Sequence, residues 1–172
     1  MAREALKSLS RRRRSIGESF LLHDPKFPHK DRASAIYQCS SLEDALQDAI
    51  LSKLMPLSKT DHARLFEGDN PLATFSAKIK LGFALGLYGQ KTRADLNCIR
   101  DIRNAFAHSK AAITFDTPEI TDACSQLKAR PDEPEWVETA EMQYFGATAQ
   151  IAMDLLMVAK RNIQHPERPL LP

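Results

Sequence analysis

The sequence predicts an all-α fold, an up-and-down bundle of about five helices, and three observations lead to this prediction. Apolar residues recur at three- and four-residue steps along most of the chain, the spacing of one buried helix face. No alternating run rich in Val, Ile and Thr is long enough to form a sheet. The 172 residues are 43% hydrophobic and 27% charged, which is enough for one core of ordinary size. Helices of this length with short connections bury their apolar stripes most economically in a bundle.

The first long helix is expected to begin after Asp31, which can cap it, and to end before Pro56. Its apolar stripe is formed by Ile36, Cys39, Leu42, Leu46, Ile50 and Leu54. The acidic residues Glu43, Asp44 and Asp48 lie largely off this stripe, so the helical spacing assigns them no site.

Two consecutive helices are expected next. One begins at Asn70-Pro71, where Asn70 caps the helix and Pro71 fits its first turn. The other begins at Thr92, whose side chain forms a cap together with Asp95, and ends near His108. Both carry apolar residues at helical spacing, so each is expected to bury one face.

Two further helices complete the predicted bundle. A short one starts at residues 117–118, and a long final one follows the polar break at residues 131–134. Residues 1–30 are expected to form a basic, partly irregular arm, and residues 31–165 a single helical domain.

Charge is distributed unevenly along the chain. The formal net charge is only +2, yet the first 15 residues carry six basic side chains and one acidic one, so the remainder is acidic on balance. The candidates for contacts with nucleic acid in the arm are Arg11, Arg12, Arg13 and Arg14. A run of arginines is also typical of a solvated terminus, and the two interpretations differ in whether binding falls steeply with salt.

Several classes of protein are not favoured by the sequence. No stretch approaches the ~18 apolar residues that a membrane span needs, so we expect a cytoplasmic protein without a membrane partner. The cysteines Cys39, Cys98 and Cys124 form no C-x-x-C pair, and no two histidines have H-x-x-x-H spacing on a predicted helix. We therefore expect no bound metal and no cofactor.

One segment carries residues suited to chemistry. Asn104 and His108 are four residues apart and share a helix face, and the long side chain of Arg103 can reach that face. The helix dipole at this C-terminal end favours imidazolium, while arginine offers a bidentate donor to phosphate. This set suits metal-independent RNA cleavage, in which a base activates the 2′-hydroxyl and a cation stabilises the phosphoryl oxygens.

The same residues have a structural interpretation. His108 can cap the last carbonyls of its helix, Asn104 can bind neighbouring backbone, and Arg103 can pair with Asp101 or Asp95. Spacing alone does not separate this interpretation from catalysis, because an arginine and a histidine five residues apart are common.

A small basic patch is a further candidate for nucleic-acid binding. Its members are Lys78, Lys80, Arg100 and Arg103, which approach one another if the second and third helices pack antiparallel. The alternative is that the two lysines are simply solvated.

The string from Arg103 to His108 resembles the R-x4-6-H motif of HEPN domains, with Asn104 as the polar residue usual after the arginine. Over about residues 35–128 the chain is similar to the mannitol operon repressor family. The strings that carry this second resemblance are Glu67-Gly68-Asp69-Asn70-Pro71-Leu72, Phe75-Ser76-Ala77-Lys78-Ile79-Lys80-Leu81, Ala84-Leu85-Gly86-Leu87, Asp95-Leu96-Asn97, Thr114-Phe115-Asp116 and Glu119-Ile120. Their order and spacing together are more specific than any one of them.

The resemblance implies a compact bacterial helical domain, a homodimer, that regulates transcription by binding a protein partner such as a regulator. The HEPN resemblance implies an alternative, a ribonuclease of the toxin type with an antitoxin partner and RNA as substrate. Arg103 would then stabilise the phosphate, His108 would be the acid or base, and Asn104 would orient one of them. Direct DNA binding through the N-terminal arm is a third hypothesis.

Overall fold

The computed structural model describes residues 4–6, 29–129 and 139–164, and these residues form helices and turns with no strand among them. This confirms the predicted all-α fold. The helices are α3 (His29–Leu51), α4 (Lys59–Phe66), α5 (Phe75–Ala84), α6 (Gln90–His108), α7 (Pro118–Ser125) and α8 (Ala140–Gln164). Within the described ranges no helix is both long and apolar enough to cross a membrane.

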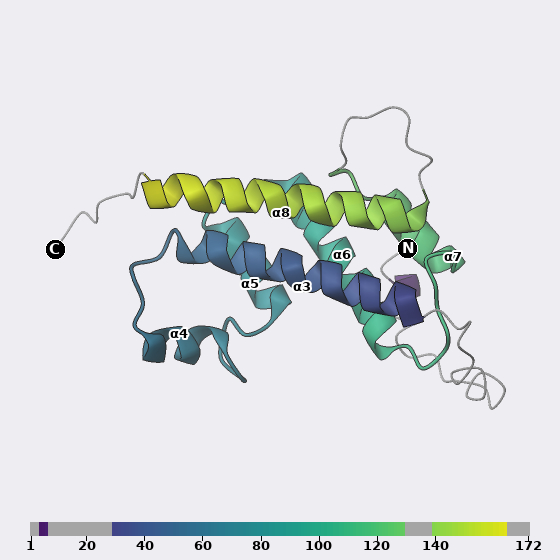
Figure 1. The fold of residues 1–172 in the computed structure, drawn as a ribbon, viewed down its shortest axis with the longest axis horizontal. Helices are drawn as coiled ribbons and strands as arrows, with labels where there is room; N and C mark the ends of the chain where they lie inside the picture. Colours follow the sequence, from purple (N-terminus) through teal and green to yellow (C-terminus); the bar gives the residue numbers. More distant parts are fainter. Residues whose placement is uncertain (1–3, 7–28, 130–138, 165–172) are drawn as a thin grey trace.

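The two longest helices, α3 and α8, lie side by side along the length of the molecule and run in the same direction (Figure 1). Tyr144 near the start of α8 donates a hydrogen bond to the carbonyl of Ala35 near the start of α3, at 3.0 Å. Asn162 near the end of α8 binds Ser52 just beyond the end of α3. Helix α6 contacts both of them and also α5 and α7, so its residues occupy the middle of the bundle.

The core is built from the stripes that helical spacing predicts. On α6 the buried apolar residues are Leu96, Ile99, Ile102, Ala105 and Phe106, and on α3 they are Ala35, Cys39, Leu42, Ala45, Leu46, Ala49 and Ile50. Ile113 and Phe115, in the segment after α6, are buried against the same cluster. Burial of these stripes supplies the main driving force for folding, because the free energy gained is roughly proportional to the apolar area removed from water.

Helix α4 lies where no helix was predicted, in the segment between Pro56 and Asp69. Its N-cap is Ser58, whose hydroxyl accepts from the backbone N–H of Asp61 at 3.1 Å. The helix has only eight residues, and Phe66 alone is buried. So short a helix shows little apolar periodicity, and for that reason apolar spacing did not predict it.

The predicted cap at Asn70 is wrong. Helix α5 begins at Phe75 with Thr74 as its N-cap, and the Asn70 amide instead donates to the carbonyls of Ala63 and Glu67. Asn70 therefore satisfies carbonyls at the end of α4 rather than amides at the start of α5. The residue type indicates a helix end, but it does not say which end.

The predicted cap at Thr92 is also wrong. Helix α6 begins at Gln90 with Gly89 at the N-cap position, and no side chain caps it. Asp95 is buried, and its Oδ2 accepts from the backbone N–H groups of residues 128 and 129 at 3.1 and 2.8 Å. This carboxylate thus ties the chain after α7 to the bundle.

Candidate functional site

The motif residues occupy the last two turns of α6, as the sequence predicted. His108 is the last residue of the helix and Ser109 is its C-cap. His108 is exposed, and it makes no hydrogen bond or ion pair with any residue that the structure describes. Arg103 is 28% exposed, and its Nη1 donates to Asn104 Oδ1 at 3.1 Å. The arginine and the asparagine of the motif therefore contact each other directly.

Glu43 of α3 contacts two cations, one from α5 and one from α6. Its Oε1 accepts from Lys78 Nζ of α5 at 2.9 Å, and its Oε2 lies 3.6 Å from Arg103 Nη2 of α6. The side chains of Lys78 and Glu43 are only 7% and 17% exposed. One carboxylate thus joins three helices and offsets much of the positive charge of two side chains, in surroundings where ion pairs are poorly screened.

Arg103 also acts on the buried thiol of Cys39. Burial raises the pKa of Cys39 to about 11, and the nearby Arg103 charge opposes this rise only in part. The thiol is therefore protonated at neutral pH and does not serve as a nucleophile. The inward-facing part of Arg103 thus lies against Glu43 and Cys39, as expected of a residue that stabilises the fold.

This arrangement limits what the motif can do chemically. A phosphate that binds Arg103 must compete with Glu43 for the guanidinium and must approach the negative charge of that carboxylate. The exposed face of Arg103, together with Asn104 and His108, remains open to solvent. The site thus consists of the Arg103 guanidinium, which Glu43 and Asn104 hold in place, and the exposed imidazole of His108.

The other predicted basic residues differ in their surroundings. Lys78 is buried on Glu43, so its interpretation as a solvated side chain is wrong. Arg100 pairs with its neighbour Asp101 at 2.8 Å and is also mostly buried. Lys80 is exposed. A role for these residues in binding nucleic acid stays a prediction.

Candidates in the N-terminal arm lie outside the described residues, namely Arg11, Arg12, Arg13 and Arg14. His62 of α4 stacks on Phe66 and lies 3.6 Å from Glu67, so it serves the packing of α4. Among the described residues, no group of three His, Cys, Asp or Glu side chains is placed to hold a metal ion.

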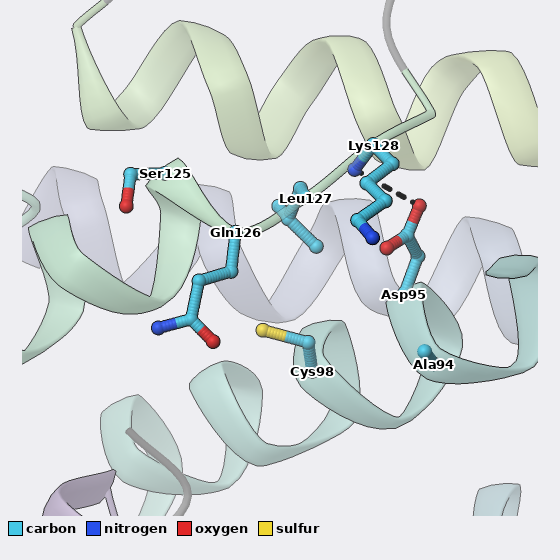
Figure 2. Close-up of a pocket in the computed structure, with 7 residues that line it drawn as sticks. All are labelled: Ala94, Asp95, Cys98, Ser125, Gln126, Leu127 and Lys128. Atoms are coloured by element: carbon cyan, nitrogen blue, oxygen red, sulfur yellow. Dashed lines mark hydrogen bonds between the residues drawn. The ribbon is translucent and has the colours of Figure 1, made fainter. Parts of the chain in front are cut away.

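A cavity of about 690 Å³ lies between α6 and the end of α7 (Figure 2). Its lining residues are Ala94, Asp95, Cys98, Ser125, Gln126, Leu127 and Lys128. The Asp95 carboxylate is occupied by backbone N–H groups, and burial raises the pKa of Cys98 to about 12. The cavity therefore offers neither a free carboxylate nor a thiolate to a ligand at neutral pH.

A comparison with known families identifies the chain more directly than the site does. A family model described as Mannitol repressor matches residues 59–157, which is more than half of the chain. The chain belongs to the mannitol repressor family. The match runs from α4 into α8, so it starts later and ends later than the resemblance over about residues 35–128. Neither the curated proteins nor the solved structures compared with the chain contain a match.

Sequence reasoning missed Glu43, the central residue of the site in this mannitol repressor family member. The residue lies off the main stripe of α3, so helical spacing assigns it to the surface. It also lies before the residues that the family model matches. Its role depends on α5 and α6 bringing Lys78 and Arg103 to it, and no local pattern in the sequence contains that information.

Proposed function

We propose that this chain is a cytoplasmic regulatory protein of bacteria that acts on transcription by binding another protein, and that Arg103 stabilises the fold rather than a reaction. Membership of the mannitol repressor family supports a regulatory role. The observation that carries the structural role of Arg103 is its engagement by Glu43 and Asn104.

A catalytic arginine must be free to bind the phosphate of its substrate. A catalytic cation gains most when its partner is the charge that develops in the transition state. Here Glu43 already provides a fixed negative charge, which also pairs with the buried Lys78. Pulling Arg103 towards a phosphate would weaken this arrangement. The energy of the ion pairs is therefore used to hold α3, α5 and α6 together.

The alternative function, metal-independent RNA cleavage, is favoured by one observation. His108 is exposed, so its imidazole is within reach of a substrate, as a general acid or base must be. Arg103 also retains an exposed face. A ribonuclease built on this motif would depend on His108, whereas the proposed regulator would not.

The two functions separate in a complementation experiment. Transcript levels are measured in the source bacterium with the gene removed, and then with the gene restored as wild type, His108→Ala or Lys110→Ala. Lys110 is an exposed neighbour of the motif and serves as the matched control. We expect loss of the gene to change a defined set of transcripts, and all three versions to restore it.

Failure of His108→Ala alone, with the protein folded and present at wild-type amount, would contradict the proposal and favour the ribonuclease. An unchanged set of transcripts after removal of the gene would contradict the regulatory role itself.

A further inference from the structure

Helix α8 exposes a row of large apolar side chains that its own chain leaves uncovered in the described residues. Phe145, Met153, Leu156 and Met157 are each between 46% and 58% exposed, and Ala149 is also exposed. We call these five residues the α8 stripe. The opposite face of the helix carries Tyr144, Ile151 and Leu155 into the core. Apolar residues on both faces of a helix indicate that it is covered on both faces in its working state.

The α8 stripe follows the spacing of a helix–helix seam. Ala149, Met153, Leu156 and Lys160 are separated by four, three and four residues, which is the alternation found where two helices pack along their length. From Phe145 to Met157 the stripe extends over about 18 Å of helix. Such a surface fits another helix better than it fits a small molecule.

Two copies of α8 complement each other when they are antiparallel and cross near Ile151. In this register the small Ala149 of one copy faces the partner's Met153, and Phe145 faces the partner's Leu156. Both pairings occur twice because the two copies are related by a two-fold axis. At the centre of the seam a large side chain, Met153, then packs against the small Ala149, as close packing requires. Farther from the centre, the apolar side chains of Phe145 and Leu156 contact each other.

Charge favours the same register. Glu141 lies in the first turn of α8, and the exposed residues Lys160 and Arg161 lie towards its end. Antiparallel pairing brings Lys160 of one copy next to the partner's Glu141 at both ends of the seam. Parallel pairing would instead place Lys160 against the partner's Lys160, a repulsive contact.

We propose that the α8 stripe is the interface at which two copies of this chain associate, antiparallel and in the register centred on Ile151. The inference goes beyond the regulatory role and does not depend on it, because it rests on the packing and charge of α8 alone. It also names the surface that a dimer uses, which the family resemblance did not.

Sedimentation velocity of the full-length protein over a range of concentrations tests the interface. We expect wild type to be a dimer at micromolar concentration. Met153→Lys should raise the dissociation constant roughly tenfold to a hundredfold, because two large apolar side chains leave the seam. Met55→Lys is the matched control, since Met55 is 65% exposed and lies in the turn after α3. It should leave the dissociation constant unchanged.

The register is tested by reversing charges. Glu141→Lys should weaken the dimer, and adding Lys160→Glu should restore most of the loss, because the pair is re-formed in both copies with opposite polarity. Circular dichroism verifies that each variant stays helical. A wild-type protein that is monomeric throughout would overturn the proposal. A dimer that Met153→Lys leaves as tight as wild type would also overturn it, because the interface would then lie elsewhere.

Discussion

Replacing Glu43 by Gln is the sharpest test of the ion-pair cluster that joins α3, α5 and α6. The substitution preserves the shape of the side chain and an oxygen that can still accept from Lys78. It removes the charge that compensates both Lys78 and Arg103. The expected result is a large loss of stability with no change of fold.

The magnitude follows from the burial of the three side chains. Breaking a buried ion pair by removing one partner costs about 3–5 kcal/mol, and the Lys78 side chain is only 7% exposed. The hydrogen bond that Gln retains to the charged Lys78 ammonium offsets about 1.5 kcal/mol of this loss. The Arg103 contact is longer and more exposed and adds about 0–1 kcal/mol. Glu43→Gln should therefore lower the free energy of unfolding by about 2–4 kcal/mol.

Urea unfolding of the full-length protein, followed by far-ultraviolet circular dichroism, measures this change. Asp44→Asn is the matched control, because Asp44 is the exposed neighbour of Glu43 and loses the same charge. Its effect should be within about 0.5 kcal/mol of zero. Adding Lys78→Met to Glu43→Gln should recover part of the loss, because the unpaired buried cation is removed. A Glu43→Gln protein as stable as wild type would refute the claim that this carboxylate braces the bundle.

Three further predictions use the same unfolding assay. Gly82→Ala should cost about 1–2 kcal/mol, because its Cβ would lie 2.9 Å from Tyr88 Oη. Gly89→Ala, whose Cβ meets nothing within 4 Å, should cost less, at most about 1 kcal/mol for alanine at the N-cap of α6, and equal effects would contradict this reasoning. Asp95→Ala should cost about 1–3 kcal/mol, because two part-buried backbone N–H groups lose a charged acceptor. A wild-type value would show that water replaces the carboxylate. Finally, burial raises the pKa of Cys39 from its ordinary value of 9.0 to about 11. The protonated thiol therefore contributes its full stability to the fold below about pH 9, and this contribution is lost as the pH rises towards 11. Unfolding should require less urea at about pH 10 than at about pH 8, and no change would contradict it.

The sequence predicted the helices whose packing follows from their own periodicity. On α6, apolar residues from Leu96 to Phe106 recur at three- and four-residue steps, and all of them lie in the core. The long final helix was predicted for the same reason, and its residues Tyr144, Ile151 and Leu155 are buried. In these segments the spacing of apolar residues alone determines which face turns inward.

Helix ends and the short helix α4 could not be predicted in the same way. Asn70 has the residue type of an N-cap, but its amide binds carbonyls at the end of α4 instead. Asp95 can form a local cap, but the folded chain brings residues 128–129 to it and gives it two stronger contacts. A polar side chain with several possible partners takes the one that tertiary structure supplies.

The sequence predicted the residues of the candidate site that lie on α6, but not the one that lies on α3. Arg103, Asn104 and His108 were found because they are neighbours on one helix. Glu43 is 60 residues away from Arg103 along the chain, and nothing local distinguishes it from Asp44, which is exposed. Local spacing therefore identified the cation but missed the carboxylate that determines its role.

The most direct test of whether Arg103 is structural is an RNA cleavage assay with the purified full-length protein and a mixed RNA pool in EDTA. Wild type, His108→Ala and Arg103→Ala are compared, and the fold and oligomeric state of each are verified first. If the motif serves the fold, wild type leaves the RNA intact, and Arg103→Ala lowers stability while His108→Ala does not. Cleavage by wild type that disappears in a folded His108→Ala protein would contradict this, and would make the motif an active site.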